Sequence, residues 1–163
     1  FSAAALAPFL LALAVRRQPL LSAGLSRRAL RPGLELGVAL GLITIFLTNR
    51  TYTLMNGLTT AQGLYFAAAL VGAFAEEFIF RGYIQLRLMD WLGETWGWLG
   101  AAVLFALWRV PQALAAGTTG TALAASLAAL LLFGLLLGWI MRRSGSILAT
   151  ALYHAVHNWI LIL

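Results

Sequence analysis

The chain has 163 residues, enough for one compact domain, and 62% of them are hydrophobic while only 10% are charged. Soluble domains are nearer half apolar and a quarter charged, so a chain with a mean hydropathy of +0.90 has too few polar groups to cover a water-exposed surface. The absence of cysteine excludes disulfides and thiolate metal sites, so any zinc would need histidine and carboxylate ligands.

Six apolar segments predict membrane-spanning helices, because a helix needs about 20 mostly apolar residues to cross a bilayer. In chain order they cover residues 1–15, 34–48, 61–88, 98–113, 121–141 and 146–163. We therefore expect an all-α fold, a polytopic transmembrane helical bundle of about six spans, in a single domain over residues 1–163. The chain opens at Phe1 instead of methionine and ends within an apolar run, so we expect a partial chain.

The positive charge consists entirely of arginine, and most of it lies between apolar runs. Alternating spans put three clusters on one side of the membrane and Arg50 on the other, and the positive-inside rule makes the first side cytoplasmic. This pattern indicates a lipid bilayer as partner and no nucleic acid, despite the net charge of +6. Richness in Ala, Leu and Arg without Lys suggests a bacterial source, hence the bacterial plasma membrane. The clusters are Arg16, Arg17, Arg27, Arg28 and Arg31, then Arg81 and Arg87, then Arg142 and Arg143.

Glycines recur at every fourth position in two of the predicted spans. Small residues on one helix face allow close helix–helix approach in lipid, so we interpret both runs as packing surfaces. The runs are Gly33, Gly37 and Gly41, and Gly134 and Gly138.

Two adjacent carboxylates, Glu76 and Glu77, interrupt the third apolar segment. A charge in lipid is costly, so such groups usually face a protein interior or a water-filled cavity. Glu77 and Arg81 are four residues apart and meet on one helix face, whereas Glu76 points about 100° away and is not used up by that pair. The pattern fits a catalytic carboxylate held beside a structural one, and it also fits a purely structural Glu–Arg bridge.

The last segment carries His154 and Asn158, one helical turn apart on the same face, with His157 on a neighbouring face. These side chains can donate to an oxyanion, and a histidine can bind a metal. Polar residues that merely hydrogen-bond across helices are equally consistent with the pattern.

Arg109 lies within the fourth apolar segment, where it needs a partner, and the obvious candidates are Glu76 and Glu77. Pro111 just beyond it predicts a kink. Counted from the predicted cytoplasmic ends at about 1.5 Å per residue, five polar residues lie about 12 to 18 Å deep, namely Glu76, Glu77, Arg109, His154 and Asn158. Three separate helices are therefore expected to bring them to one site.

The order Glu76-Glu77-x-x-x-Arg81, then a motif beginning at Phe105, then His154-x-x-x-Asn158 resembles the CPBP (ABI) family of intramembrane proteases. That family comprises Rce1-type CAAX prenyl proteases and bacteriocin-processing enzymes. The resemblance covers residues 72–158.

The resemblance implies that Glu76 is the general base that activates a water, with Glu77 and Arg81 in support. It implies that His154 and Asn158 stabilise the tetrahedral oxyanion. The substrate implied is a membrane-associated peptide, prenylated or carrying a leader peptide. The family is labelled metalloprotease-like, yet a metal-free glutamate mechanism is also argued for it, so a zinc ion and no cofactor both stay open. Candidate ligands are Glu76, His154 and His157.

The sequence departs from the family at Arg109, which stands where the family has histidine. Arginine stays protonated, so it can neither act as a base nor bind zinc. Three interpretations of Arg109 stay open. In the first, Arg109 donates hydrogen bonds to the water or oxyanion, and in the second His157 replaces the missing ligand. In the third, the protein is a non-catalytic membrane scaffold or bacteriocin-immunity protein. A transporter is less favoured, because no inverted repeat with broken helices is visible.

Overall fold

The computed structural model describes residues 4–163, and these residues form helices and connecting loops with no β-strand. The all-α prediction is therefore confirmed. In chain order the elements are α1 (Leu6–Val15), the 3₁₀ helix η1 (Leu20–Ala23), α2 (Arg27–Leu47), α3 (Thr51–Met55), α4 (Thr60–Glu77), the π-helical segment η2 (Phe78–Gln85), α5 (Leu86–Leu92), α6 (Glu94–Trp108), α7 (Val110–Ala115), α8 (Gly120–Ser144) and α9 (Ile147–Ile160).

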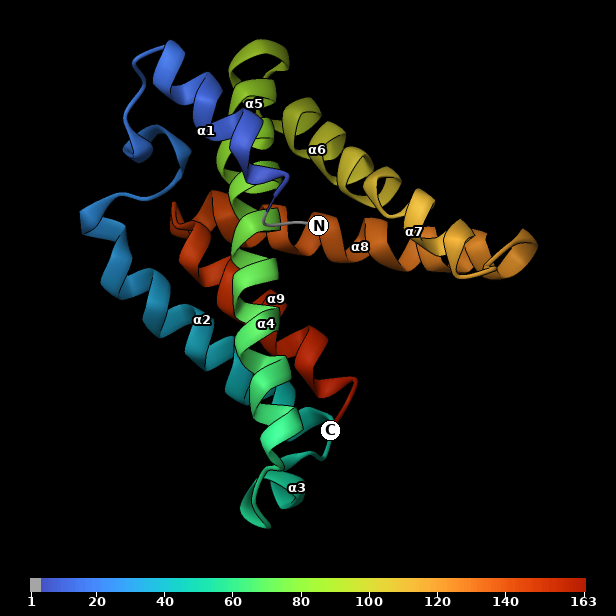
Figure 1. Cartoon of the computed structure of the whole chain (residues 1–163). Helices are drawn as coiled ribbons and strands as arrows, with labels where there is room; N and C mark the ends of the chain where they lie inside the picture. The colour runs from blue at the N-terminus through green and yellow to red at the C-terminus, as the bar shows by residue number, and fades with distance from the viewer. Residues whose placement is uncertain (1–3) are drawn as a thin grey trace.

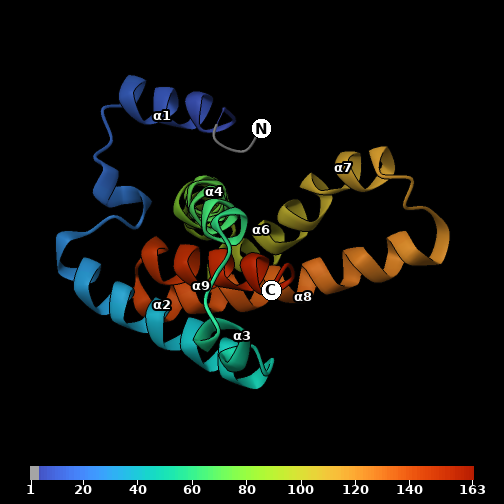
Figure 2. The ribbon, with the colours of Figure 1, turned by 60° about the horizontal axis from the view of Figure 1, so that its bottom comes forward.

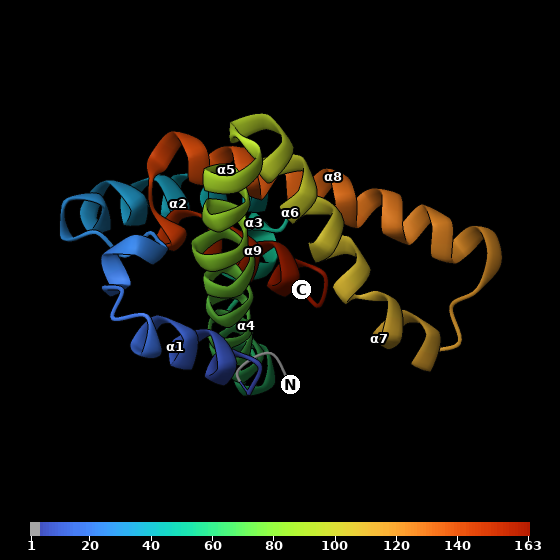
Figure 3. The ribbon, with the colours of Figure 1, turned by 90° about the horizontal axis from the view of Figure 1, so that it is seen from above.

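Helices α4, η2 and α5 run on without a break and form the central column of the bundle (Figure 1). α9 packs against α2 on one side and against α4 on the other, and α6 packs against α8. Seen from a second direction, α8 and α9 lie side by side below the column, with α2 beside α9 (Figure 2). α6 and α7 diverge from α8 toward the loop that joins α7 to α8 (Figure 3).

Four helical stretches within residues 4–163 are long and apolar enough to cross a membrane: Leu20–Leu47, Thr60–Leu92, Glu94–Ala115 and Gly120–Ser144. Each of the six predicted segments is mainly helical within residues 4–163, and residues 1–3 of the first segment lie outside the described residues. The count of six spans is not confirmed. α1 has 10 residues and α9 has 14, and at about 1.5 Å per residue neither reaches across a hydrocarbon core about 30 Å thick. The short helix α3 was not predicted.

The outer surface of the bundle is apolar, while its interior encloses a group of charged side chains. Phe46 on α2 and Leu132 on α8 are 75% and 68% exposed, whereas Glu77 and Arg81 are 0% and 1% exposed. A water-soluble bundle has the opposite distribution, since exposed apolar surface is unfavourable in water. The fold is therefore suited to an apolar solvent, and the charged side chains are kept inside the bundle.

The glycine runs lie in helix–helix contacts, as predicted. A Cβ atom at Gly37 of α2 would lie 2.8 Å from Cβ of Leu152 on α9, and one at Gly138 of α8 would lie 2.6 Å from the Trp98 ring on α6. Both distances are shorter than a normal van der Waals contact, so these backbones approach one another only because a side chain is missing.

The arginine-rich ends meet as the topology prediction requires. Arg87 on α5 donates to Gln18, just before η1, and to Ser22 within η1. Arg142 at the end of α8 pairs with Glu94 at the start of α6 at 2.8 Å. The assignment of Arg81 to a cytoplasmic arginine cluster is wrong. Arg81 is 1% exposed and lies inside the bundle, so it is not a topology signal. Its place near a predicted helix end made it look like part of the cluster.

We predict that Gly37→Leu destabilises the protein while Gly63→Leu does not. The new side chain at position 37 would overlap Leu152, and overpacking of this kind typically costs about 1–3 kcal/mol. Gly63 is also helical but has open space where its Cβ would be. Thermal unfolding of the two variants in detergent should therefore show a lowered midpoint for the first alone. Equal midpoints would mean that the α2–α9 contact is not close-packed.

Candidate active site

Glu76 and Glu77 end the regular part of α4, and the chain then continues as the π-helical segment η2, which contains Arg81. A π-helical turn is wider than an α-helical one and often occurs at functional sites. The two carboxylates leave the helix in different directions, so each can meet a different neighbour. This separation is the one that the sequence predicted from the angle between adjacent helical residues.

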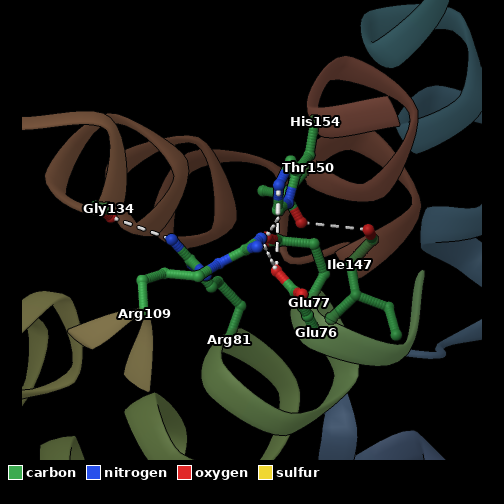
Figure 4. A network of polar contacts seen from close by, with 8 residues as sticks. All are labelled: Glu76, Glu77, Arg81, Arg109, Gly134, Ile147, Thr150 and His154. Carbon is green, nitrogen blue, oxygen red and sulfur yellow. Dashed lines mark hydrogen bonds and ion pairs between the residues drawn. The ribbon is translucent and has the colours of Figure 1, made fainter. Parts of the chain in front are cut away.

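Glu77 is the centre of a fully buried network (Figure 4). Its Oε1 lies 3.1 Å from Nη1 of Arg81, as the spacing of four residues predicts, and 2.8 Å from Nδ1 of His154 on α9. Because a carboxylate can only accept, Nδ1 of His154 is the donor in this contact. Glu77 therefore fixes the orientation of the imidazole and directs its Nε2 away from the carboxylate.

Arg81 is held on three sides. Besides its ion pair with Glu77, its Nη2 donates to the carbonyl oxygen of Gly134 on α8 at 3.4 Å, and its guanidinium lies 4.2 Å from the ring centroid of Phe105 on α6. A guanidinium over an aromatic face is stabilised by the ring quadrupole, most of all in a desolvated place. Phe105, which the sequence identified only as the start of a motif, thus forms part of the support for the ion pair.

Glu76 is 4% exposed and meets a different cation. Its Oε2 lies 2.6 Å from Nη2 of Arg109, which confirms one of the two partners predicted for this arginine, and 3.9 Å from Nε2 of His154. Arg109 occupies the break between α6 and α7 next to Pro111, where the sequence predicted a kink. The side chain of Arg109 is 24% exposed, and its Nη1 donates to Gln112.

A cleft of about 490 Å³ opens beside this network between α6, α7, α8 and α9. Its polar lining includes Arg109, His154, His157 and Asn158. His157 stacks on Phe133 with ring centroids 4.4 Å apart. The structure thus brings all seven predicted polar residues into one region: Glu76, Glu77, Arg81 and His154 in the buried network, and Arg109, His157 and Asn158 at the cleft.

The residues present do not fit a resident zinc ion. A catalytic zinc site needs three protein ligands at about 2.0–2.2 Å, and among residues 4–163 no three His, Asp or Glu side chains gather closely enough to hold a metal. Of the candidate ligands, Glu76 and His154 face each other, but Glu76 is paired with a guanidinium and His157 stacks on Phe133. We therefore derive no step through a metal.

Sequence reasoning missed several polar partners of the site. The Gly134 carbonyl accepts from Arg81, Gln112 accepts from Arg109, and the Thr150 hydroxyl donates to the Ile147 carbonyl at 3.0 Å, one turn from His154 (Figure 4). A backbone carbonyl has no sequence signature. The position of Gln112, three residues after Arg109, was a usable signal for the second contact.

The fold and the site define an integral membrane protein with a buried carboxylate–histidine–arginine centre beside a cleft. The family model for type II CAAX prenyl endopeptidases, Rce1-like, matches residues 58–160, and the chain belongs to this family of proteases. The resemblance seen in the sequence is thereby confirmed. No curated protein and no solved structure matches the chain.

We predict that Arg81→Leu destabilises the protein by about 3–5 kcal/mol, because it leaves the Glu77 carboxylate buried without its cation. Arg31→Leu is a matched control, since Arg31 and Glu35 have the same spacing of four residues but side chains 89% and 62% exposed. Exposed pairs of this kind are worth about 0.3–0.5 kcal/mol. Denaturant unfolding in detergent measures both.

The double variant Glu77→Gln with Arg81→Leu distinguishes the cost of an unpaired buried carboxylate from the cost of losing the packing contacts of Arg81. It removes the stranded carboxylate, so it should recover a large part of the stability lost in Arg81→Leu. If Arg81→Leu costs no more than Arg31→Leu, the buried ion pair is not the main support of this region.

Proposed function

We propose that the protein is an intramembrane endopeptidase that hydrolyses a peptide bond of a membrane-associated substrate with a water activated by Glu76. The observation that carries the proposal is the convergence of Glu76, His154 and Arg109 from three helices beside one cleft. The family supplies the reaction class. Within that class, the substrate is a prenylated protein or one that carries a leader peptide, and the membrane is the plasma membrane of a bacterium.

In the proposed reaction the peptide lies in the cleft and the water lies between Glu76 and the scissile carbonyl. Glu76 takes a proton from the water while the oxygen of the water attacks the carbonyl carbon, and the carbonyl oxygen becomes an oxyanion. Glu76 then returns the proton to the leaving nitrogen as the C–N bond breaks. The products are a new carboxylic acid and a new amine, and the carboxylate of Glu76 is restored. The acid then loses its proton to the amine or to solvent, which gives a carboxylate and an ammonium group.

Asn158 and His154 are suited to stabilise the oxyanion. Asn158 lines the cleft one turn beyond His154, so its amide can donate to an oxygen in the cleft. In its doubly protonated form His154 can donate from Nε2 while Nδ1 still donates to Glu77. Preorganised donors of this kind are typically worth about 10²–10³ in rate each.

Arg109 acts as a further donor in this scheme. Its guanidinium has five N–H groups, and the contacts with Glu76 and Gln112 use two of them. The Nε–H is buried, so the second N–H of Nη1 and the second N–H of Nη2 are the donors left for a substrate carbonyl in the cleft that the side chain lines. Arg109 cannot exchange a proton at neutral pH, so this role is electrostatic only.

We predict that Glu76→Gln lowers the rate of peptide cleavage by about 10²–10⁴-fold, because a positioned general base contributes that much. The assay uses purified protein in lipid vesicles and a fluorogenic peptide library. Glu35→Gln is the control, since Glu35 is a carboxylate on an exposed part of α2. Addition of a zinc chelator should leave the rate unchanged.

Two results would contradict this assignment. If the Glu76→Gln variant cleaves as fast as its parent, another group is the base. A chelator that abolishes the Glu76-dependent activity would show that a metal takes part.

The second candidate function is that of a non-catalytic scaffold or bacteriocin-immunity protein. The observation in its favour is the 2.6 Å ion pair between Arg109 and Glu76, which neutralises the proposed base. In this role the pair is structural, and a membrane-embedded binding surface takes the place of a reaction. The two candidates assign opposite consequences to changes at position 109.

We predict that Arg109→His raises the Glu76-dependent cleavage rate by about tenfold or more, because an imidazole beside Glu76 can exchange a proton, and a positioned acid or base contributes about 10²–10⁴-fold. Arg109→Leu tests the scaffold function, in which loss of the cation lowers the melting temperature in detergent. Inactivity of the folded parent and of folded Arg109→His, together with a lowered melting temperature for Arg109→Leu, would favour the scaffold.

A further inference from the structure

The surplus positive charge is concentrated at one end of the bundle. In the site, Arg81 and Arg109 are each paired with a glutamate, so the site adds no net charge. At the end where η1, α5, the start of α6 and the end of α8 meet, eight arginines stand against three carboxylates, Glu35, Asp90 and Glu94. Five of the six surplus charges of the chain therefore lie there.

A second cleft, of about 520 Å³, opens within this end, separate from the proposed active site. One part of its lining has two cations, Arg142 and Arg143, with Trp139 and one carboxylate, Glu94. Another part is apolar, with Leu21 and Met89 among others. A cleft with both kinds of wall matches a ligand that is anionic at one end and apolar at the other.

The two arginines of this cleft are held in place without being neutralised by a buried partner. The guanidinium of Arg142 lies 5.2 Å from the Trp98 ring centroid, and that of Arg143 lies 5.7 Å from the Trp139 ring centroid. Arg142 pairs with Glu94, but the Glu94 side chain is 74% exposed. An ion pair this open is weak, so a ligand anion can compete for Arg142.

We infer that this cleft binds an anionic phospholipid, with Arg142 and Arg143 on the headgroup phosphate and an acyl chain along Leu21 and Met89. A soluble anion would use only the cationic wall, whereas a lipid uses both walls. Arginine clusters beside membrane helices attract anionic headgroups, and tryptophan favours the same interfacial level. The inference does not depend on the protease function.

The test compares two double variants that lose the same charge at the same end. Arg142→Gln with Arg143→Gln removes the cations of the cleft, and Arg27→Gln with Arg28→Gln removes two exposed cations at the start of α2. Native mass spectrometry of protein released from phosphatidylcholine nanodiscs with added phosphatidylglycerol measures lipid retention. We expect the first variant to lose about thirtyfold in affinity, as for two arginines near an anionic surface, and the second to lose much less.

Glu94→Gln provides an independent variant that removes a competing carboxylate and should raise the affinity for phosphatidylglycerol. Circular dichroism in phosphatidylcholine alone checks that each variant is folded, and Arg143→Gln alone replaces the double variant if that one is not. Equal losses in the two double variants would overturn the inference, because they indicate diffuse attraction without a site. Binding of glycerol phosphate as tight as that of the lipid would also overturn it, since the apolar wall would then have no role.

Discussion

The cost of placing two carboxylates inside an apolar bundle is the constraint on which this structure depends. A buried charge without a partner costs several kcal/mol, so Glu76 and Glu77 need cations that their own helix supplies only in part. Arg81 comes from the same column, but Arg109 comes from the α6–α7 break and His154 from α9. Satisfying the two carboxylates thus joins three helices at one depth. The glycine contacts of α2 with α9 and of α6 with α8 let these helices pack closely enough for the partners to reach the two carboxylates.

The two adjacent glutamates have different surroundings, and in the proposed reaction this difference gives Glu77 a supporting role and Glu76 the chemical one. Glu77 is enclosed by Arg81 and His154 and is 0% exposed, so its part is to orient the imidazole. Glu76 has a contact with a side chain that reaches the cleft, and His154 Nε2 faces it at 3.9 Å. That distance is too long for a direct hydrogen bond and suits a bridging water. The same imidazole is therefore fixed by one carboxylate and presented to the other.

Local spacing predicted a large part of this arrangement, because it needs only helical geometry. The Glu77–Arg81 pair and the divergence of Glu76 follow from 3.6 residues per turn. The break near Pro111 follows from the chemistry of proline, and the common depth was predicted from the helical rise of about 1.5 Å per residue. The contact of His154 with Glu77 instead of Glu76 depends on how α9 is rotated against α4, which a single sequence does not encode locally. The π-helical segment was also missed, since its residues have no distinctive propensity. The lengths of α1 and α9 are the reason why the count of six spans is not confirmed, because an apolar segment can form a short packed helix as well as one that crosses the membrane.

Arg109 changes the space beside Glu76 as well as its charge. An arginine side chain is long enough to reach from the α6–α7 break to Oε2 of Glu76 at 2.6 Å, and it fills the intervening volume with its own atoms. The histidine that the family resemblance implies at this position is shorter, so it would leave more room next to the carboxylate, where the proposed reaction places the water. The guanidinium is also held by Gln112 and lies 5.9 Å from the Phe105 ring centroid, so its position is supported from two further directions. Catalysis by this chain thus requires the guanidinium to share Glu76 with a water or to turn toward the cleft, and its partial exposure gives it the room to do so.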